Sequence, residues 1–438
     1  MLTVDLSKYK AVLDNAYVRK VGKVSQVVGL TIESLGPEVN LGGTCYIRAT
    51  KHSEPVLAEV VGFRSGNILL MPLGNIQGIG PGSLVEATNK PITIKVSDEL
   101  LGRVLNGLGM PMDGKPPISN GKEFTVGNKP PDPLMRNRIS QPLSLGVRAL
   151  DGLLTIGKGQ RVGIFAGSGV GKSTLMGMIA RNTSAEVNVI GLIGERGREV
   201  REFIEKDLGE EGLKRSVLVI ATSDQPALVR LKAAEVAMAI AEYFREGARD
   251  VLLLMDSLTR FAMAQREVGL AAGEPPVSRG YTPSVFSLLP KLLERAGNSD
   301  KGSVTGMYTV LVDGDDFTEP VTDTARGILD GHIVLSRKIA SRNQYPAIDV
   351  LASISRCMSD IVDNNHKKAA GEIKKLMAVY ADAEDLVNIG AYVKGSSADI
   401  DIAVEKNPAI RAFLTQAVDE KINFDETLEM MNEIVEGV

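Results

Sequence analysis

The pattern of apolar and polar positions divides the chain into parts of different character. From Val21 to Thr88, short β-branched runs alternate with turn residues, as in VSQVVGLTIESLG, TCYIRAT and NILLMPLG. Several short strands at this spacing are typical of a small sheet or barrel, so we expect an N-terminal β domain. The Pro-rich stretch from Lys129 to Leu134, KPPDPL, predicts an extended connector without regular structure.

After Gly159, apolar runs of strand length alternate with longer helical stretches, which is typical of a parallel sheet covered by helices. The expected strands are Arg161 to Phe165, Val187 to Ile193, Val217 to Ala221, Val251 to Met255, Val304 to Val312 and His332 to Leu335. A helix is expected from Ala227 to Arg245, with Asp224 as its candidate cap and Pro226 near its first turn. Beyond about Asp360 the pattern predicts a small helical domain.

Composition and charge narrow the function classes. The apolar share of 44% and the charged share of 24% are ordinary for a folded soluble protein, and 438 residues predict roughly two or three domains. Cys45 and Cys357 lie far apart in the sequence, so neither a disulfide framework nor a thiolate zinc site is indicated. The net charge of −4, without a block of Lys or Arg, argues against a nucleic-acid partner.

The same residues bear on location. The opening MLTVDLSKYK places Asp5, Lys8 and Lys10 where a signal peptide needs an unbroken apolar stretch. The apolar runs are far shorter than the ~20 residues needed to cross a bilayer. We therefore expect a cytoplasmic protein whose membrane contact is at most peripheral.

A nucleotide site is indicated by AGSGVGKST, from Ala166 to Thr174, which follows the strand RVGIF and precedes the helical TLMGMIARN. Strand, Gly-rich loop and helix are the context of a P-loop, whose backbone N–H groups face phosphates. Lys172 would neutralise the β/γ-phosphate oxygens and Ser173 would bind Mg²⁺. The other candidate ATP-binding residues are Gly167, Ser168, Gly169, Val170, Gly171 and Thr174. The alternative is a Gly-rich turn, since Ala166 stands where the strict pattern has Gly.

Two carboxylates follow predicted strands. Asp256 ends the run VLLLMD, the form of a Walker B element that can hold the Mg²⁺ shell, although acids also follow buried strands because solvent begins there. Glu195 follows VNVIGLI and could orient the water that attacks the γ-phosphate. The alternative for Glu195 is a solvated charge cluster at the start of a helix.

Five further blocks, in order along the chain, carry a family resemblance: GERGREV, MDSLTRFAMAQRE, LLERAGN, DGHIVLSR and YPAIDVLASISR. With the P-loop they resemble the catalytic subunits of the rotary ATPase group, closely from Gly146 to Met358. The resemblance implies an α/β fold: a RecA-like P-loop ATPase core with an N-terminal small β-barrel and a C-terminal helical domain. The implied domains are residues 1–88, 89–360 and 361–438, and the implied activity is Mg²⁺-dependent ATP hydrolysis.

The resemblance also implies roles for single residues around the phosphates. Glu195 becomes the catalytic carboxylate, with Arg196 nearby, and Glu199 supports the water shell of the Mg²⁺ ion. Asp256 becomes the Walker B acid, and Arg260 approaches the γ-phosphate.

The family resemblance also implies roles for Tyr345 and Arg356, which lie later in the chain. Tyr345, just before Pro346, resembles the aromatic that stacks on adenine, whereas on its own it would be an ordinary core or turn aromatic. Arg356 matches the arginine finger that reaches the γ-phosphate of a neighbouring subunit, whereas outside this motif it would be a surface salt bridge. A planar guanidinium suits the charge that develops on a transferring phosphoryl group.

Details of sequence indicate the branch of the group. LLERAGN, TVLVDGDD, ILDGHIVLSR and MPLGNIQGIGPGS resemble flagellar and type III protein export ATPases rather than synthase β subunits. The run NIGAY from Asn388 to Tyr392 favours the flagellar branch. The alternatives are a virulence-type III secretion ATPase, an F/V-type synthase catalytic subunit, a RecA-like nucleic-acid motor and a nucleotide-binding assembly module.

The export resemblance implies a cellular setting. It implies ATP and Mg²⁺ as ligands, a homo-hexameric ring, and partners among stalk, stator-like regulator and export-gate proteins. Secreted substrates and their chaperones are further implied partners, and nucleic acid is not. The implied location is the cytoplasm, peripheral at the inner face of the cell membrane.

Overall fold

The computed structural model describes residues 20–50, 52–88, 90–312, 314 and 316–436. The expectation drawn from Asp5, Lys8 and Lys10 lies outside these residues. One compact unit comprises the described residues up to Ile92 together with Glu267–Pro275, and the second comprises Thr93–Arg266 with the residues from Pro276 onward. The predicted domain limits at 88/89 and 360/361 stay predictions.

The first unit contains a closed six-stranded barrel, as the β-branched runs predict. Its strands follow the order β1-β2-β5-β4-β3-β6, and β1 closes the barrel on β6. Alternate side chains such as Val24, Ile47 and Val60 fill the interior, and burial raises the pKa of the Cys45 thiol among them to about 11. The strands are β1 Val21–Val28, β2 Thr31–Leu35, β3 Thr44–Arg48, β4 Val56–Arg64, β5 Asn67–Pro72 and β6 Leu84–Ala87.

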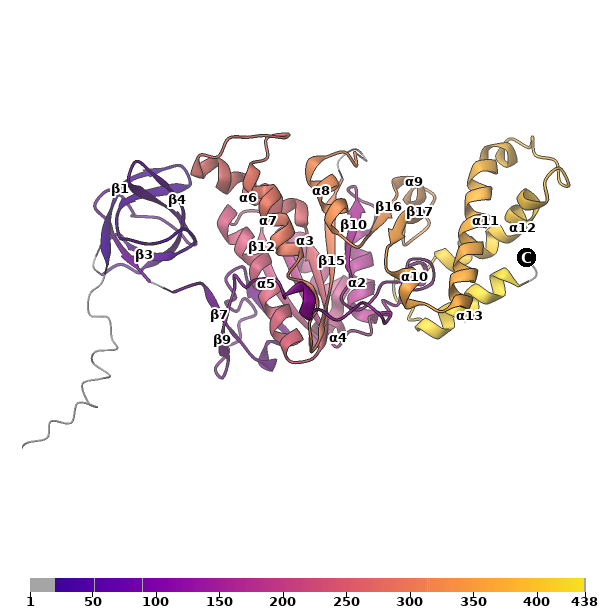
Figure 1. Cartoon of the computed structure of the whole chain (residues 1–438), viewed down its shortest axis with the longest axis horizontal. Coiled ribbons are helices and arrows are strands. Elements are labelled where there is room, and N and C mark those ends of the chain that lie inside the picture. The colour runs from indigo at the N-terminus through magenta and orange to yellow at the C-terminus, as the bar shows by residue number, and fades with distance from the viewer. Residues whose placement is uncertain (1–19, 51, 89, 313, 315, 437–438) are drawn as a thin grey trace, which may run out of the picture. The chain divides into compact units, whose positions relative to one another are not determined.

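The second unit is built on one sheet with the strand order β17-β16-β10-β15-β13-β11-β12-β8 (Figure 1). All strands on this path run parallel except β17, and the short β14 pairs antiparallel with β15. Most residues of the central strands are buried because helices cover both faces, which produces the apolar runs of the sequence. The strands are β8 Arg103–Asn106, β10 Arg161–Ala166, β11 Val187–Glu195, β12 Ser216–Thr222, β13 Asp250–Asp256, β14 Gly297–Asn298, β15 Ser303–Leu311, β16 Gly331–Leu335 and β17 Ile348–Ser355.

The six expected strands are confirmed, whereas two edge strands were not expected. β8 has only four residues, too few to show a period, and β17 is an antiparallel edge strand that exposes Leu351 and Ile354. A separate two-stranded sheet joins β7 Thr93–Val96 to β9 Lys122–Thr125.

Helices pack on the sheet, and the longest is α5, Ala227–Glu246, which contacts β11, β12 and β13. The cap predicted at Asp224 is wrong. The N-cap position is occupied by Pro226, which has no side-chain acceptor for the first N–H groups, so the helix begins without a side-chain cap. The other helices of the core are α2 Lys172–Asn182, α3 Gly197–Glu202, η4 Phe203–Leu208, α4 Gly209–Lys214, α6 Leu258–Ala272, α7 Pro283–Leu293, α8 Pro320–Ile328, α9 Arg337–Ala340 and α10 Met358–Ile361.

The connector differs from the prediction in one respect. It contains a single 3-10 turn, η2 at Pro133–Met135, because the Asp132 side chain accepts a hydrogen bond from the N–H of Leu134. Arg136 then fastens the connector by donating to the carbonyl oxygen of Ala296 at 2.8 Å. Two short turns remain, η1 at Asp98–Leu100 and η3 at Ala149–Leu153.

The predicted C-terminal helices are α11 Asn364–Asn388, α12 Ala398–Leu414 and α13 Phe424–Val435 (Figure 1). They pack tightly on η3, since a Cβ at Gly152 would lie 2.5 Å from the sulfur of Met431 and 3.0 Å from the Phe413 ring. Arg148 ties them further by donating to the Phe413 carbonyl at 2.8 Å and pairing with Glu420. None of the helices in the described residues has the length and apolarity that crossing a bilayer requires.

Candidate active site

The phosphate loop follows β10 at the carboxyl edge of the sheet and runs directly into α2. Gly169 and Gly171 have φ of 77° and 85°, which side chains with a Cβ rarely adopt, so the loop needs glycine at both positions. Gly171 is the N-cap of α2, and Lys172 and Ser173 begin the helix. The free N–H groups and the positive end of α2 therefore face the same space as the loop.

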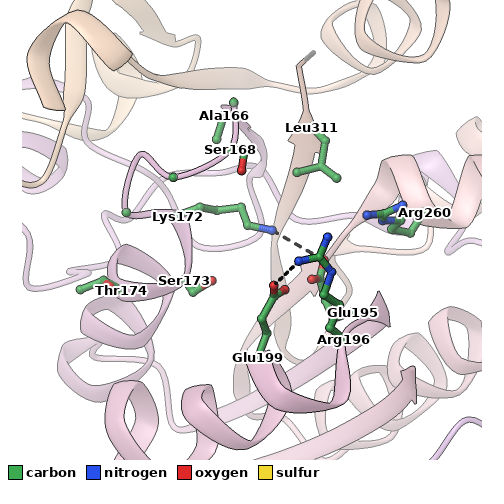
Figure 2. Close-up of a pocket in the computed structure, with 13 residues that line it drawn as sticks. Ala166, Ser168, Lys172, Ser173, Thr174, Glu195, Arg196, Glu199, Arg260 and Leu311 are labelled. Atoms are coloured by element: carbon green, nitrogen blue, oxygen red, sulfur yellow. Dashed lines mark hydrogen bonds and ion pairs between the residues drawn. The ribbon is translucent and has the colours of Figure 1, made fainter. Parts of the chain in front are cut away.

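A cavity of about 500 Å³ opens in front of this loop (Figure 2). It gathers residues from the carboxyl ends of β10, β11 and β15 and from α3 and α6, as expected where parallel strands end at one edge. The lining residues are Ala166, Gly167, Ser168, Gly169, Gly171, Lys172, Ser173, Thr174, Glu195, Arg196, Glu199, Arg260 and Leu311.

Lys172 stands between the two predicted carboxylates. Its Nζ forms an ion pair with Asp256 Oδ1 and lies 3.8 Å from Glu195 Oε1. Asp256 is buried behind the lysine, and its Oδ1 also accepts a hydrogen bond of 2.7 Å from the Thr309 hydroxyl. The lysine is thus held at the cavity by opposite charge, and the acids of two neighbouring strands share it.

Glu195 has an altered acidity. Its pKa is raised to about 7: burial is the largest cause, the negative charge of Asp256 acts in the same direction, and the positive charge of Lys172 opposes both. Glu199 acts in the same upward direction through a hydrogen bond and its charge. A carboxyl group that titrates near neutral pH can accept or hold a proton in that range.

This acidity predicts a pH dependence. If Glu195 acts as a base it must be ionised, and because its pKa is raised to about 7, kcat/KM for ATP should increase with pH through a midpoint near 7. The measurement is kcat/KM as a function of pH, at a Mg²⁺ concentration at which the protonation state of the nucleotide does not change over the pH range. In Glu199→Gln the midpoint should move to lower pH, since a group that raises the pKa is removed. A flat profile through neutral pH would contradict the assignment.

Two arginines line the cavity in different ways. The stem of Arg260 lies against Gly194, where a Cβ would come within 2.9 Å of it, and its buried Nε has no hydrogen-bond partner among the described residues. Arg260 is nevertheless one of the residues that line the cavity, where its positive charge favours an anion. Arg196, whose side chain is 77% exposed, lies 3.5 Å from Glu199 in an ion pair at the rim.

A second cavity of about 380 Å³ lies on the other side of the loop. Tyr345 borders it, and a Cβ at Gly171 would meet the tyrosine ring at 3.4 Å. The N–H of Gln416 donates to the Tyr345 carbonyl at 2.9 Å, so the C-terminal segment closes this cavity. Its lining residues are Gly169, Gly171, Thr174, Leu175, Met178, Tyr345, Pro346, Gln416 and Val418.

Three predicted site residues do not line either cavity: Asp256, which is buried behind Lys172 as described above, Val170 and Arg356. Val170 is buried at 2% exposure and packs in the core, where its side chain supports the loop from behind. Arg356 follows β17, is exposed, and donates to the carbonyl of Arg326 at 3.3 Å. A finger for a neighbouring subunit has no need to reach its own cavity.

Three family models match successive parts of the chain. The β-barrel domain of the ATP synthase alpha/beta family matches residues 24–89, and the nucleotide-binding domain of that family matches residues 146–355. The C-terminal domain of the type III secretion ATPase EscN matches residues 362–433.

Full-length relatives decide the family. The flagellum-specific ATP synthase of Bacillus subtilis (strain 168) is 55% identical over 417 residues, 95% of each chain. The type 3 secretion system ATPase of Xanthomonas euvesicatoria is 52% identical over 418 residues, again 95% of each. The chain belongs to the flagellar and type III secretion ATPases. The resemblance inferred from the sequence blocks is therefore confirmed, and this export ATPase is an ATP-hydrolysing enzyme.

Solved structures confirm the fold of this export ATPase. The assembled ATPase EscN of the enteropathogenic E. coli type III secretion system is 46% identical, with a TM-score of 0.89, and the match covers 94% of this chain and 100% of that one. EscN in complex with its central stalk EscO gives a TM-score of 0.87 at the same identity and coverage. The predicted α/β core with a β-barrel before it and a helical domain after it is thus correct.

Sequence reasoning missed several residues that this export ATPase places at the site. Thr309 lies inside a buried strand, where an apolar pattern gives no sign of a polar contact to Asp256. Gln416 and Val418 lie 71 and 73 positions beyond Tyr345, and only the fold brings them beside it. Leu311 lines the first cavity as a strand end.

Proposed function

We propose that this ATPase hydrolyses ATP with Mg²⁺ to energise protein export through a flagellar-type III apparatus, working as a homo-hexameric ring. The observation that carries the proposal is that the P-loop lysine pairs with two acids, Glu195, which lines the cavity, and Asp256, which is buried beside it, in a chain whose relatives are flagellar and type III secretion ATPases. The roles of single residues below belong to this proposal.

Each group at the first cavity has a task that its geometry suits. Lys172 neutralises β/γ-phosphate oxygens, the P-loop N–H groups cradle them, and Arg260, which lines the cavity, approaches the γ-phosphate with its positive charge. Glu195, which titrates near neutral pH, orients the attacking water and takes up its proton. When phosphate oxygens pair with Lys172, its two carboxylate partners are released. Glu195 can then bind the attacking water, and Asp256 can contribute to the shell of the Mg²⁺ ion.

The donors present fit Mg²⁺. The Ser173 hydroxyl and the Glu199 carboxylate line the cavity, and the Asp256 carboxylate lies behind Lys172. Within the part of the chain that the structure describes, no three His, Cys, Asp or Glu side chains form a closed metal cluster. Mg²⁺ keeps several waters and takes one or two carboxylates together with substrate phosphates, so an open set of oxygen donors suits it. Once bound, the ion neutralises charge on the β/γ oxygens.

The second cavity is proposed to hold the adenine base. Its walls combine the Tyr345 ring with apolar side chains of α2, Leu175 and Met178, and Gln416 supplies the polar group. An aromatic face and a few polar atoms are the usual lining of a nucleobase site.

Arg356 is proposed to serve the site of the next subunit. It is exposed beside an edge strand whose Leu351 and Ile354 are 46% and 47% exposed, an apolar border suited to a subunit contact. The EscN structures are of an assembled ATPase, which supports a ring here.

The proposal also includes partner proteins and a cellular location. A stalk protein is supported by the EscN structure with its central stalk EscO. A stator-like regulator, export-gate proteins, secreted substrates and chaperones rest on the family resemblance alone, as does a cytoplasmic position peripheral to the membrane. Relatives from the flagellar and secretion branches match at 55% and 52% identity, so the flagellar assignment rests on the sequence blocks.

Dilution tests the ring. If Arg356 acts across an interface, specific ATPase activity should fall as the protein is diluted below its assembly concentration, because a monomer then lacks a finger. Activity and particle mass are measured on the same dilution series by coupled assay and mass photometry. Constant specific activity in demonstrably monomeric protein would mean that one subunit holds a complete site.

A further inference from the structure

Arg356 is held at two points by one short segment. Its N–H donates to the Asp330 carbonyl at 3.0 Å, and its Nη2 donates to the Arg326 carbonyl at 3.3 Å. Arg326 lies in the last turn of α8, whose final carbonyls have no partner within the helix and form the negative end of its dipole. A guanidinium is favoured there, so the end of α8 determines where the Arg356 side chain points.

The end of α8 is itself fixed by an aromatic ring. The guanidinium carbon of Arg326 lies 5.7 Å from the ring centroid of Phe317, within the range of a cation–π contact. The ring of Phe317 lies 6.3 Å from that of Phe165. Phe317 thus joins α8 to a side chain of the central sheet.

Phe165 connects this group to the phosphate loop. It is the next-to-last residue of β10, directly before Ala166, and its ring lies over Gly163, where a Cβ would come within 2.3 Å. The same ring meets His332 edge to face at 6.0 Å, and His332 Nε2 lies 3.1 Å from the Ala352 carbonyl of β17. Packed side chains therefore connect β10, which precedes the phosphate loop, to β17, which precedes Arg356.

The pKa of His332 is consistent with two guanidinium groups close to its ring. Burial lowers the pKa of His332, and the positive charges of Arg326 and Arg356 lower it further, as expected if both guanidinium groups lie beside its ring. A neutral His332 donates to Ala352 without adding a third positive charge to the group.

We propose that Phe317 and Arg326 are positioning residues for Arg356: they fix the end of α8, whose carbonyl aims the finger at the neighbouring subunit. The proposal rests on the proposed function, in which Arg356 acts in trans. Misplacing a catalytic group by about 1 Å can lower a rate ~10²-fold, so weakening its support should slow catalysis without weakening the subunit's own nucleotide binding.

Single variants give the first test. Phe317→Leu and Arg326→Met should each lower kcat about three- to tenfold, the size of one cation–π contact, with KM for ATP unchanged. Phe317→Tyr keeps the ring face and should retain nearly wild-type kcat. Thermal midpoints and ring mass are recorded for every variant, and Arg326→Met remains as the test if Phe317→Leu is unstable.

Mixed rings separate finger positioning from an effect on the variant subunit's own site. In the first mixture, a donor with Lys172→Ala and Phe317→Leu supplies the finger to a receiver with Arg356→Ala. In the second, the donor carries Lys172→Ala alone and the receiver carries Arg356→Ala and Phe317→Leu. The single-turnover burst rate of co-assembled rings should be three- to tenfold lower in the first mixture only, and the parent pair without Phe317→Leu is the reference.

The outcomes are distinct. Equal burst rates in the two mixtures, or a loss confined to the second, would overturn the positioning role, because Phe317 would then act through its own phosphate loop. If Phe317→Tyr is as slow as Phe317→Leu, the ring face is not the acting feature and the proposal fails. A parent pair without any burst would reject the trans finger itself, and the positioning role with it.

Discussion

Glu195→Gln is expected to lower kcat about 10²- to 10⁴-fold while ATP affinity stays close to wild type. The amide keeps the shape of the side chain but cannot accept a proton from the attacking water. It also removes a negative charge that lies 3.8 Å from Lys172, so phosphate binding is not weakened. Single-turnover hydrolysis and the dissociation constant of a labelled nucleotide are measured on the same preparation.

Two further variants complete this experiment. Lys172→Ala should lose nucleotide affinity as well as turnover, since the ammonium is needed in the ground state too. Glu205→Gln is the matched control, because Glu205 is exposed and pairs only with Arg201 on the surface in the contacts described. Turnover near wild type in Glu195→Gln would remove Glu195 from the mechanism.

The second large effect is expected for Arg356→Ala. A stabilising arginine supplied in trans contributes on the order of 10³ or more in rate, so this variant should be nearly inactive although its own cavity is intact. Mixing it with Lys172→Ala should restore activity, because an interface that combines Lys172 of one subunit with Arg356 of the other is complete. The measurement is the burst of product in a single turnover of co-assembled rings.

Single-turnover conditions are chosen because the sites of a ring can be required to hydrolyse ATP in sequence. A mixed ring would then stop after its first hydrolysis step. Each parent alone sets the background, and wild-type rings set the full burst. Mixed rings that co-assemble without any burst would show that Arg356 does not act across the interface. It would then be a structural contact of α8 through Arg326.

The sequence predicted the central sheet well because its strands are covered on both faces. Full burial leaves an unbroken apolar run in β13 and one interrupted only by Asn188 in β11, and a run of strand length is visible without any alignment. The edges are different: β8 has four residues, too few for a period to show in the sequence. Asp224 is a typical cap residue in sequence, but the proline two residues later occupies the cap position instead.

The candidate site was predictable as far as it follows local rules. The P-loop is continuous in sequence, and Glu195 and Asp256 were found because both end buried parallel strands, whose carboxyl ends share an edge. The roles given to these residues stay predictions until they are measured. Residues that meet through tertiary packing, such as Thr309 and Gln416, carry no local signal and required the structure.

Gln416 gives the second cavity a property beyond binding. Its backbone N–H donates to the Tyr345 carbonyl, and its side-chain amide accepts from the N–H of Arg148 and donates to the Gly146 carbonyl. One residue between α12 and α13 thus links Tyr345 to the start of the core and to the C-terminal helices. We therefore expect a ligand whose binding moves Tyr345 to shift those helices as well; if it does, a partner that binds the helices changes the affinity for that ligand by the same factor. Tyr345 would then couple the second cavity to the C-terminal helices as well as lining it.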